Sequence, residues 1–262
     1  MRDVNHGLFD CIASQPGYQT AQQVVDLRTS NSSYVVFDLK PVSGSAAPNV
    51  PPEGPGSVMS VKSANVPPAA IKEYEAGAQT LSSGKDLGSA IKSFKKAIEI
   101  APNFTEAYTL MGMAYLGQKK FDDAEKNFVK AAEIDSTSAP AFIGLGEAQN
   151  SLGKFGDAQQ TLAKAVTLAP DSAEAHYELA KSLWGLNRWS EAEPEATKAI
   201  ALNPGYADAH VLMGNILLRK RDAAGALKEF QESLRLAPKG PMAEPTRQLV
   251  SKLESALKAN SK

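Results

Sequence analysis

The chain has 262 residues, of which 43% are hydrophobic and 22% are charged, a composition typical of a folded globular protein. Its 28 Lys and Arg residues nearly balance its 29 Asp and Glu residues, which argues against a nucleic-acid-binding protein, because such proteins carry a basic excess. The single cysteine, Cys11, excludes an intramolecular disulfide, and no apolar run approaches the ~20 residues that a membrane-spanning helix requires.

Three short β-strands are predicted near the N-terminus. The stretches CIAS, TAQQVVDL and SYVVFDL are rich in β-branched and aromatic residues, and the turn-like sequences PGYQ and RTSNS separate them. We therefore expect residues 1–41 to form a partial β-strand segment. Residues 42–66 contain PVSGSAAPNVPPEGPGS, whose Pro, Gly and Ser content is typical of a linker.

A short phrase then returns with a period of 34 residues. It reads AIEIAPNF at 97–104, AVTLAPDS at 165–172, AIALNPGY at 199–206 and SLRLAPKG at 233–240. This period defines five repeats, and we call the position of a residue within its repeat its phase, with the first residue at phase 1. The repeats are 71–104, 105–138, 139–172, 173–206 and 207–240.

Each repeat is predicted to contain two helices. Apolar residues recur three and four positions apart over phases 1 to about 13 and again over phases 18 to 30, the spacing of one helical face. The proline at phase 32, present in four of the five repeats, ends the second helix because it cannot join a helix interior. Small residues at phases 8, 20 and 27 allow two helix axes to approach closely. One such pair cannot bury its own apolar face, so the pairs must stack.

This pattern resembles the tetratricopeptide repeat over residues 71–240, about two thirds of the chain. The resemblance implies a mostly α fold, an α-solenoid in which five helix–turn–helix repeats (67–240 with the approach to the first helix) form a right-handed superhelix. Three departures are local. Ala196 stands at phase 24, where the other repeats have a large apolar residue, Pro194 lies in the second helix of repeat four, and Gly77 weakens the first helix of repeat one.

The last segment, 241–262, is predicted to contain a capping helix over residues 243–259. Leu249, Val250, Leu253 and Leu257 share one helical face, and Lys and Glu lie opposite. Such a helix covers the apolar face that the last repeat leaves open. A membrane-surface or partner-binding helix is the alternative, which the short apolar stripe disfavours.

No combination of residues typical of catalysis, metal binding or cofactor binding is found in the sequence. His176 and His210 occupy phase 4, where other repeats have Tyr or Phe, so we expect both to be packing residues. The motif GLGEAQ at 144–149 half-matches a dinucleotide-binding loop but lies within a predicted helix. We therefore expect a non-enzymatic protein without a cofactor.

In the tetratricopeptide family the first helices line a concave groove, and phases 2, 5, 9 and 12 point into it. This resemblance implies that the groove binds a protein or peptide segment, so that the protein acts as an interaction scaffold. Leu116 and Leu218 are equally compatible with the core. The candidate peptide-binding residues are Thr109, Met113, Leu116, Ile143, Glu147, Asn150, Tyr177, Lys181, Trp184, Val211, Asn215 and Leu218.

Family members that bind the acidic tails of heat-shock chaperones place Lys and Asn at phases 5 and 9 of the first repeat. They also place Lys and Arg at phases 2 and 6 of the third. The corresponding residues here are Glu75, Gln79, Pro140 and Gly144, so we expect no carboxylate clamp. A segment with apolar anchors is the expected partner, and neither nucleic acid nor a membrane span is expected.

The sequence GLFDCIASQPGYQTAQQVVDL, followed by SYVVFDLKP, resembles the last strands of a carboxypeptidase-regulatory-type β-sandwich. This resemblance implies an alternative, in which the chain is a docking module of a larger secreted or cell-envelope protein whose β-sandwich binds the target. As written, the N-terminus lacks a signal peptide and indicates a cytoplasmic protein; a truncated N-terminus would permit a periplasmic or envelope location. The sequence does not specify the oligomeric state.

Overall fold

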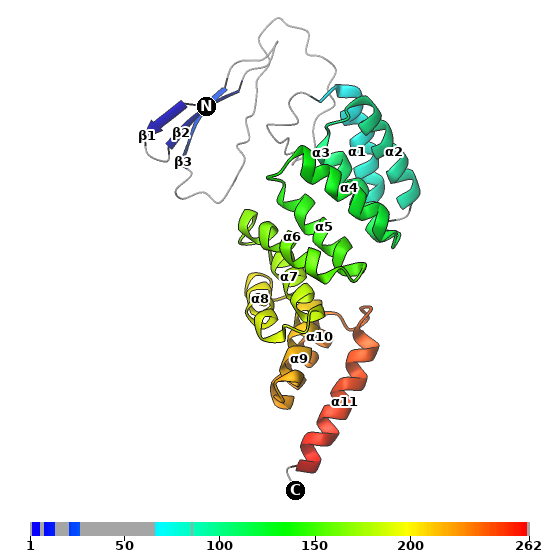
Figure 1. Ribbon diagram of the computed structural model, residues 1–262, viewed down its shortest axis with the longest axis vertical. Coiled ribbons are helices and arrows are strands. Elements are labelled where there is room, and N and C mark those ends of the chain that lie inside the picture. Colours follow the sequence, from blue (N-terminus) through cyan, green and yellow to red (C-terminus); the bar gives the residue numbers. More distant parts are fainter. Residues whose placement is uncertain (1, 6–7, 14–20, 27–65, 85, 261–262) are drawn as a thin grey trace, which may run out of the picture. The chain divides into compact units, whose positions relative to one another are not determined.

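The computed structural model describes residues 2–5, 8–13, 21–26, 66–84 and 86–260, which belong to two units, Met1–Asn65 and Val66–Lys262. In the first unit, β1 (Arg2–Asn5), β2 (Leu8–Ala13) and β3 (Ala21–Asp26) form an antiparallel sheet in the order β1-β2-β3 (Figure 1). The predicted strands CIAS and TAQQVVDL overlap β2 and β3. The third predicted strand, SYVVFDL, and the predicted linker up to residue 65 lie outside the described residues.

The strand β1 was not predicted, because RDVN has a single β-branched residue, Val4, and no aromatic residue. Its pairing with β2 is irregular, and the register shifts between Asp3 and Asn5. The pairing of β2 with β3 is regular over six residue pairs, from Leu8 opposite Asp26 to Ala13 opposite Ala21. The β-sandwich that the sequence suggested remains a prediction.

The second unit consists of helices throughout its described residues, and successive pairs follow one another in chain order (Figure 1). Each predicted repeat holds one pair. The helices are α1 (Pro68–Ser83), α2 (Leu87–Ile100), α3 (Thr105–Gly117), α4 (Phe121–Ile134), α5 (Ala139–Ser151), α6 (Phe155–Leu168), α7 (Ala173–Gly185), α8 (Trp189–Leu202), α9 (Ala207–Arg219), α10 (Ala223–Leu236) and α11 (Ala243–Asn260). The predicted α-solenoid with a C-terminal helix is therefore confirmed.

Within a pair, a large side chain on the second helix fits against a small residue on the first. A Cβ atom placed on Gly112 would lie 2.8 Å from the ring of Phe128, and one placed on Gly77 would lie 2.7 Å from the ring of Phe94. Gly77 was expected to weaken the first helix of repeat one. Its missing side chain thus leaves the space that the Phe94 ring occupies. Phe94 and Phe128 are completely buried as a result.

Repeat four satisfies the same constraint with the opposite choice of residues. Ala180 stands at phase 8 where Gly112 and Gly214 stand in their repeats, and Ala196 stands at phase 24 where Phe128 and Phe230 stand. Both alanines are completely buried in one hydrophobic cluster. The small residue at Ala196 is therefore accompanied by a larger residue at phase 8 than the glycine of repeats two, three and five. Helix α8 also continues through Pro194, which removes one backbone donor from its interior.

The two histidines at phase 4 tie consecutive repeats together. Nδ1 of His176 lies 2.6 Å from Oε2 of Glu195, and its Nε2 lies 3.0 Å from the carbonyl oxygen of Pro170. His210 repeats this arrangement with Glu229 and with the carbonyl oxygen of Pro204. The phase-32 proline that ends one repeat thus also supplies a hydrogen-bond acceptor to the next.

Helix α11 packs against the last repeat. Leu249, Val250 and Leu253 contact a buried cluster that includes Val211 and Phe230. Thr246 is almost completely buried, and its hydroxyl donates to the carbonyl oxygen of Met242. The apolar stripe of α11 therefore covers the end of the hydrophobic core, as a capping helix does.

The pairing of Ala180 with Ala196 predicts a coupled pair of substitutions. Ala196→Phe alone is expected to lower the free energy of unfolding by about 1–3 kcal/mol, because the Cβ atom of Ala180 occupies the space that the ring needs. The double variant Ala180→Gly/Ala196→Phe is expected to lose less stability than the two single variants together. We expect its free energy of unfolding, measured by urea denaturation, to exceed the value for additive effects by about 1 kcal/mol.

The matched control is Ala163→Gly/Ala196→Phe. Ala163 is exposed on α6, so its substitution costs the same helix propensity of about 1 kcal/mol without opening space for the ring. Additive effects are expected for this control. Additive effects in both double variants would contradict the proposed complementarity.

Candidate peptide-binding groove

The odd-numbered helices form the more closely spaced layer of the stack. Contacts join α1 to α3, α3 to α5, α5 to α7 and α7 to α9, whereas the even-numbered helices of the described residues make no comparable contacts with one another. A curved stack brings its helices closest together on its inner side. The candidate peptide-binding residues all lie on α3, α5, α7 and α9, within this layer.

The twelve candidate residues differ in their accessibility. Met113 is exposed, with 42% of its surface accessible. The buried members contribute to packing within the layer, and they are Thr109, Ile143, Asn150 and Val211. The partly exposed members are Leu116, Glu147, Tyr177, Lys181, Trp184, Asn215 and Leu218.

Helix α7 presents an accessible aromatic row. Tyr177, Lys181 and Trp184 are spaced four and three residues apart, so they share one face. The ring of Tyr177 lies 4.7 Å from the ring of Tyr206, which ends the same repeat in the turn before α9, and the ammonium of Lys181 lies 5.5 Å from the Tyr177 ring. The guanidinium of Arg219 lies 5.8 Å from the ring of Trp184. Aromatic and cationic groups of α7 and α9 therefore adjoin along this layer.

A polar network centred on Glu178 lies between α5 and α7. The carboxylate of Glu178 accepts a 2.8 Å hydrogen bond from Nδ2 of Asn150 and pairs with the ammonium of Lys181 at 2.7 Å. The same Nδ2 atom also donates to the carbonyl oxygen of Glu178, at 2.9 Å. Because Glu178 is only 4% exposed, this network fixes α5 against α7.

Several ionisable groups around this network have shifted pKa values. Burial raises the pKa of Glu147 to about 7, the charges of Glu178 and Glu174 act in the same direction, and Lys181 opposes the rise. Partial burial and Glu178 raise the pKa of Glu174. The pKa values of Tyr177 and Tyr206 are also raised, first by burial, with Glu178 and Asp208 among the further causes. The surroundings of these groups are thus electronegative.

Two residues of the candidate groove, Glu178 and Tyr206, were not identified from the sequence. Glu178 stands at phase 6, which was not counted among the groove-facing phases. Its charge could have identified it, because the other repeats have apolar or small residues at phase 6: Ala76, Leu110, Gly144 and Leu212. Tyr206 stands at phase 34, in the turn before α9, where helical periodicity gives no orientation.

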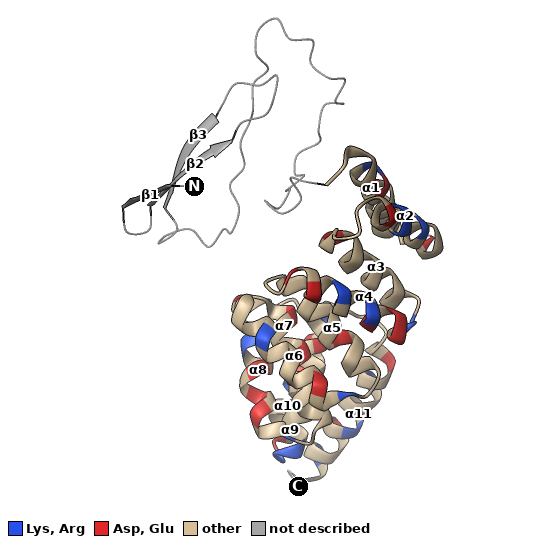
Figure 2. Ribbon diagram, turned by 45° about the horizontal axis from the view of Figure 1, so that its top comes forward, with Lys and Arg blue, Asp and Glu red and all other residues tan. Residues whose placement is uncertain are grey.

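Charges of both signs alternate along the helices, and neither sign covers the helical unit as a whole (Figure 2).

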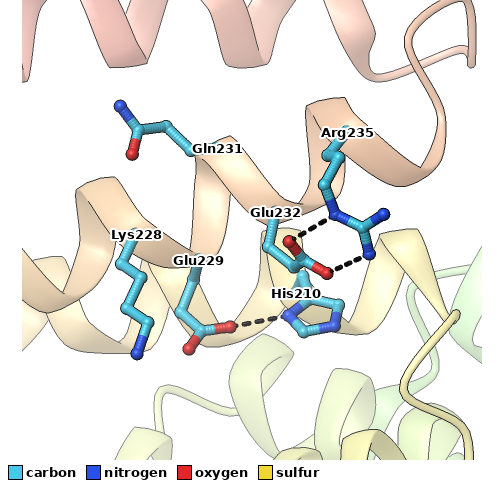
Figure 3. Close-up of a pocket in the computed structure, with 6 residues that line it drawn as sticks. All are labelled: His210, Lys228, Glu229, Gln231, Glu232 and Arg235. Carbon is cyan, nitrogen blue, oxygen red and sulfur yellow. Dashed lines mark hydrogen bonds and ion pairs between the residues drawn. The ribbon is translucent and has the colours of Figure 1, made fainter.

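One pocket lies away from the candidate residues, at α9 and α10. Its lining consists of His210, Lys228, Glu229, Gln231, Glu232 and Arg235, and it contains the His210–Glu229 contact and the Glu232–Arg235 ion pair (Figure 3). None of the described helices combines the length and the apolarity needed to cross a membrane.

The raised pKa of Glu147 predicts a pH-dependent stability. Its pKa is about 7 in the folded protein against an ordinary value of 4.5, so folding takes up a proton in this interval and stability falls as the pH rises through it. Glu147→Gln is expected to remove this dependence. As the pH rises from 5 to 8, the free energy of unfolding of wild type should fall by about 2–3 kcal/mol relative to that of the variant, measured by urea denaturation.

The control for this measurement is Glu99→Gln, which removes an exposed carboxylate at the end of α2. Its stability is expected to follow wild type at both pH values. Parallel behaviour of Glu147→Gln and wild type would show that Glu147 is ionised in the folded protein throughout this range.

Comparisons with known proteins agree with this architecture. Family models described as tetratricopeptide repeat match residues 74–104, 93–126, 115–176, 150–196 and 177–241. The matched residues together span well over half of the chain. A comparison with curated proteins found no match.

Solved structures show the same fold. A crystal structure of MamA is 27% identical with a TM-score of 0.53, and the alignment covers 62% of this chain and 95% of MamA. YrrB, described as a TPR protein with an unusual peptide-binding site, is 24% identical with a TM-score of 0.53, covering 68% and 92%. PilF of Pseudomonas aeruginosa is 20% identical with a TM-score of 0.57, covering 73% and 91%. The repeat pattern, the stacked helix pairs and the matching family models together show that the chain belongs to the tetratricopeptide-repeat family.

Proposed function

We propose that this protein is a non-enzymatic scaffold that holds a peptide or protein segment in the concave groove of its odd-numbered helices. The observation that carries this proposal is the row of Tyr177, Lys181 and Trp184 on α7, whose side chains are neither fully buried nor fully exposed. Partly accessible aromatic side chains are typical of binding hot spots, because a partner can bury their remaining surface.

The surrounding residues supply both rigidity and specificity. Tyr206 packs against the Tyr177 ring from the turn before α9, and Arg219 lies against the Trp184 ring. Anchors that are positioned before binding lose little conformational entropy when the partner arrives. The charged groups beside them fix the register of the bound segment. Met113 on α3 offers a further apolar contact toward the N-terminal end of the layer.

Membership of the tetratricopeptide-repeat family supports a protein or peptide as the partner. The description of YrrB as a peptide-binding member is consistent with this proposal. The positions of the carboxylate clamp hold Glu75, Gln79, Pro140 and Gly144, and Gly144 is buried against the ring of Phe128. We therefore propose a partner other than an acidic chaperone tail.

The test is affinity capture from a lysate of the source cells, with bound proteins identified by mass spectrometry. Wild type is compared with Tyr177→Ala/Trp184→Ala, whose helical content is checked by circular dichroism. We expect the double variant to lose a partner that wild type retains, because each truncated hot-spot aromatic typically costs about 2 kcal/mol or more.

The matched control is Val129→Ala/Trp189→Ala. These two exposed apolar residues lie on the even-numbered helices α4 and α8. This variant is expected to capture the same partner as wild type. Retention of the partner by Tyr177→Ala/Trp184→Ala, or its loss from the control, would place the binding surface elsewhere.

A further inference from the structure

The groove of repeats three to five collects carboxylates from three helices. Glu147 comes from α5, Glu174 and Glu178 come from α7, and Asp208 comes from α9. These helices adjoin in the order α5, α7, α9, and each of the four carboxylates raises the pKa of Tyr177 or Tyr206, whose rings lie 4.7 Å apart, so the four lie around this pair of rings. We call Glu147, Glu174, Glu178 and Asp208 the acidic cluster.

The cationic groups near the acidic cluster are engaged within the protein. The ammonium of Lys181 pairs with Glu178, at 2.7 Å, and also lies over the Tyr177 ring. The guanidinium of Arg219 lies against Trp184, one turn further along the groove. The raised pKa of Glu147 indicates that Lys181 does not offset the combined effect of burial and the neighbouring carboxylates.

A buried amide oxygen beside the acidic cluster lacks a donor. Asn150 is 6% exposed, and its Nδ2 atom donates both to the backbone oxygen and to the carboxylate of Glu178. Both partners are acceptors, so the orientation of the amide is fixed. Its Oδ1 atom is then left without a hydrogen-bond partner in the described part of the chain. A buried acceptor without a donor is costly, and a side-chain movement that brought this oxygen into contact with an N–H group of a partner would relieve that cost.

The aromatic residues beside the acidic cluster suit the aliphatic stem of a basic side chain. The rings of Tyr177 and Tyr206 lie 4.7 Å apart with planes inclined at 44°, and both are partly exposed. Lys and Arg side chains pack their methylene groups on aromatic faces, and their charged heads are attracted to those faces. The region therefore combines an apolar surface for the stem with acceptors for the head.

We propose that the groove selects a protein segment bearing a Lys or Arg side chain, whose stem packs on Tyr177 and Tyr206 and whose charged head is held by Glu147 and Glu174. This inference rests on the proposed function and adds the charge of the partner to it. The head donates hydrogen bonds to the two carboxylates. An acidic segment is rejected, because it would bring further negative charge into the acidic cluster.

The experiment begins with a phage-displayed library of random peptides, selected against the full-length protein. Peptides that also bind Tyr177→Ala/Trp184→Ala are removed by counter-selection, so that the remaining peptides depend on the groove. We expect these peptides to share one position enriched in Lys or Arg beside apolar residues. A synthetic, fluorescein-labelled copy of the strongest binder is then the probe for measurements of Kd by fluorescence anisotropy.

The deciding variant is Glu147→Gln/Glu174→Gln, which removes two carboxyl groups but leaves the buried Glu178 network intact. We expect it to weaken binding of the probe by about tenfold, as the loss of a charge-assisted contact does. The same variant should bind a probe with Met in place of the enriched Lys or Arg about as well as wild type binds that probe. The matched control, Glu99→Gln/Glu133→Gln, removes two exposed carboxylates from α2 and α4 and should leave both affinities unchanged.

The outcomes separate this inference from the proposed function. Groove-dependent peptides that lack a basic position, or that bind Glu147→Gln/Glu174→Gln as tightly as wild type, overturn the inference while the proposed function stands. A weakening by the control as large as that by the deciding variant also overturns it, because net charge alone would then explain the effect. If no groove-dependent peptide is selected, the proposed function falls and the inference falls with it.

Discussion

The fit of one large side chain against one small residue within each helix pair is the constraint on which the helical unit depends. Phe94, Phe128 and Phe230 fill this space against glycines of the facing helix, and repeat four fills it with two alanines. Two alanines have a smaller combined volume than a glycine and a phenylalanine, and in repeat four further buried residues of the same cluster, such as Leu179 and Leu183, complete the packing. Because protein interiors are close-packed, such a fit fixes the separation of the two helices and the rotation of each about its axis.

The separation of the helices within a pair determines how the next pair can stack, and hence how the odd-numbered helices are spaced. Phe128 illustrates the connection, because its ring touches Gly112 in its own repeat and Gly144 in the following one. The aromatic row of α7 and the acidic cluster lie on helices held in this way. The surface that we propose for binding is therefore held mainly by helices, with Tyr206 added from the turn before α9, and its aromatic side chains are positioned before a partner arrives.

The polar network of Glu178 shows how specificity is added to this framework. Asn150 and Glu178 are 28 residues apart, and stacking alone brings them together. Burying a carboxylate is unfavourable unless it is paired, and Asn150 and Lys181 supply that pairing. The same arrangement leaves Glu147 with a raised pKa and Asn150 with an unpaired oxygen. The paired groups of the network and the groups to which we assign partner binding are thus adjacent.

The sequence by itself determined the period of 34 residues, the two helices of each repeat and the capping helix. These features depend on local chemistry: apolar periodicity, proline at phase 32 and small residues at fixed phases. Only the tertiary structure decided that Thr109, Ile143 and Val211 are buried and that Tyr177 meets Tyr206. It also showed that Lys119, Asn187 and Arg221 adopt left-handed backbone conformations at the phase where Gly153 stands. The physical reason is that helical phase gives the direction of a side chain, whereas its burial, charge environment and turn geometry depend on the neighbouring repeat.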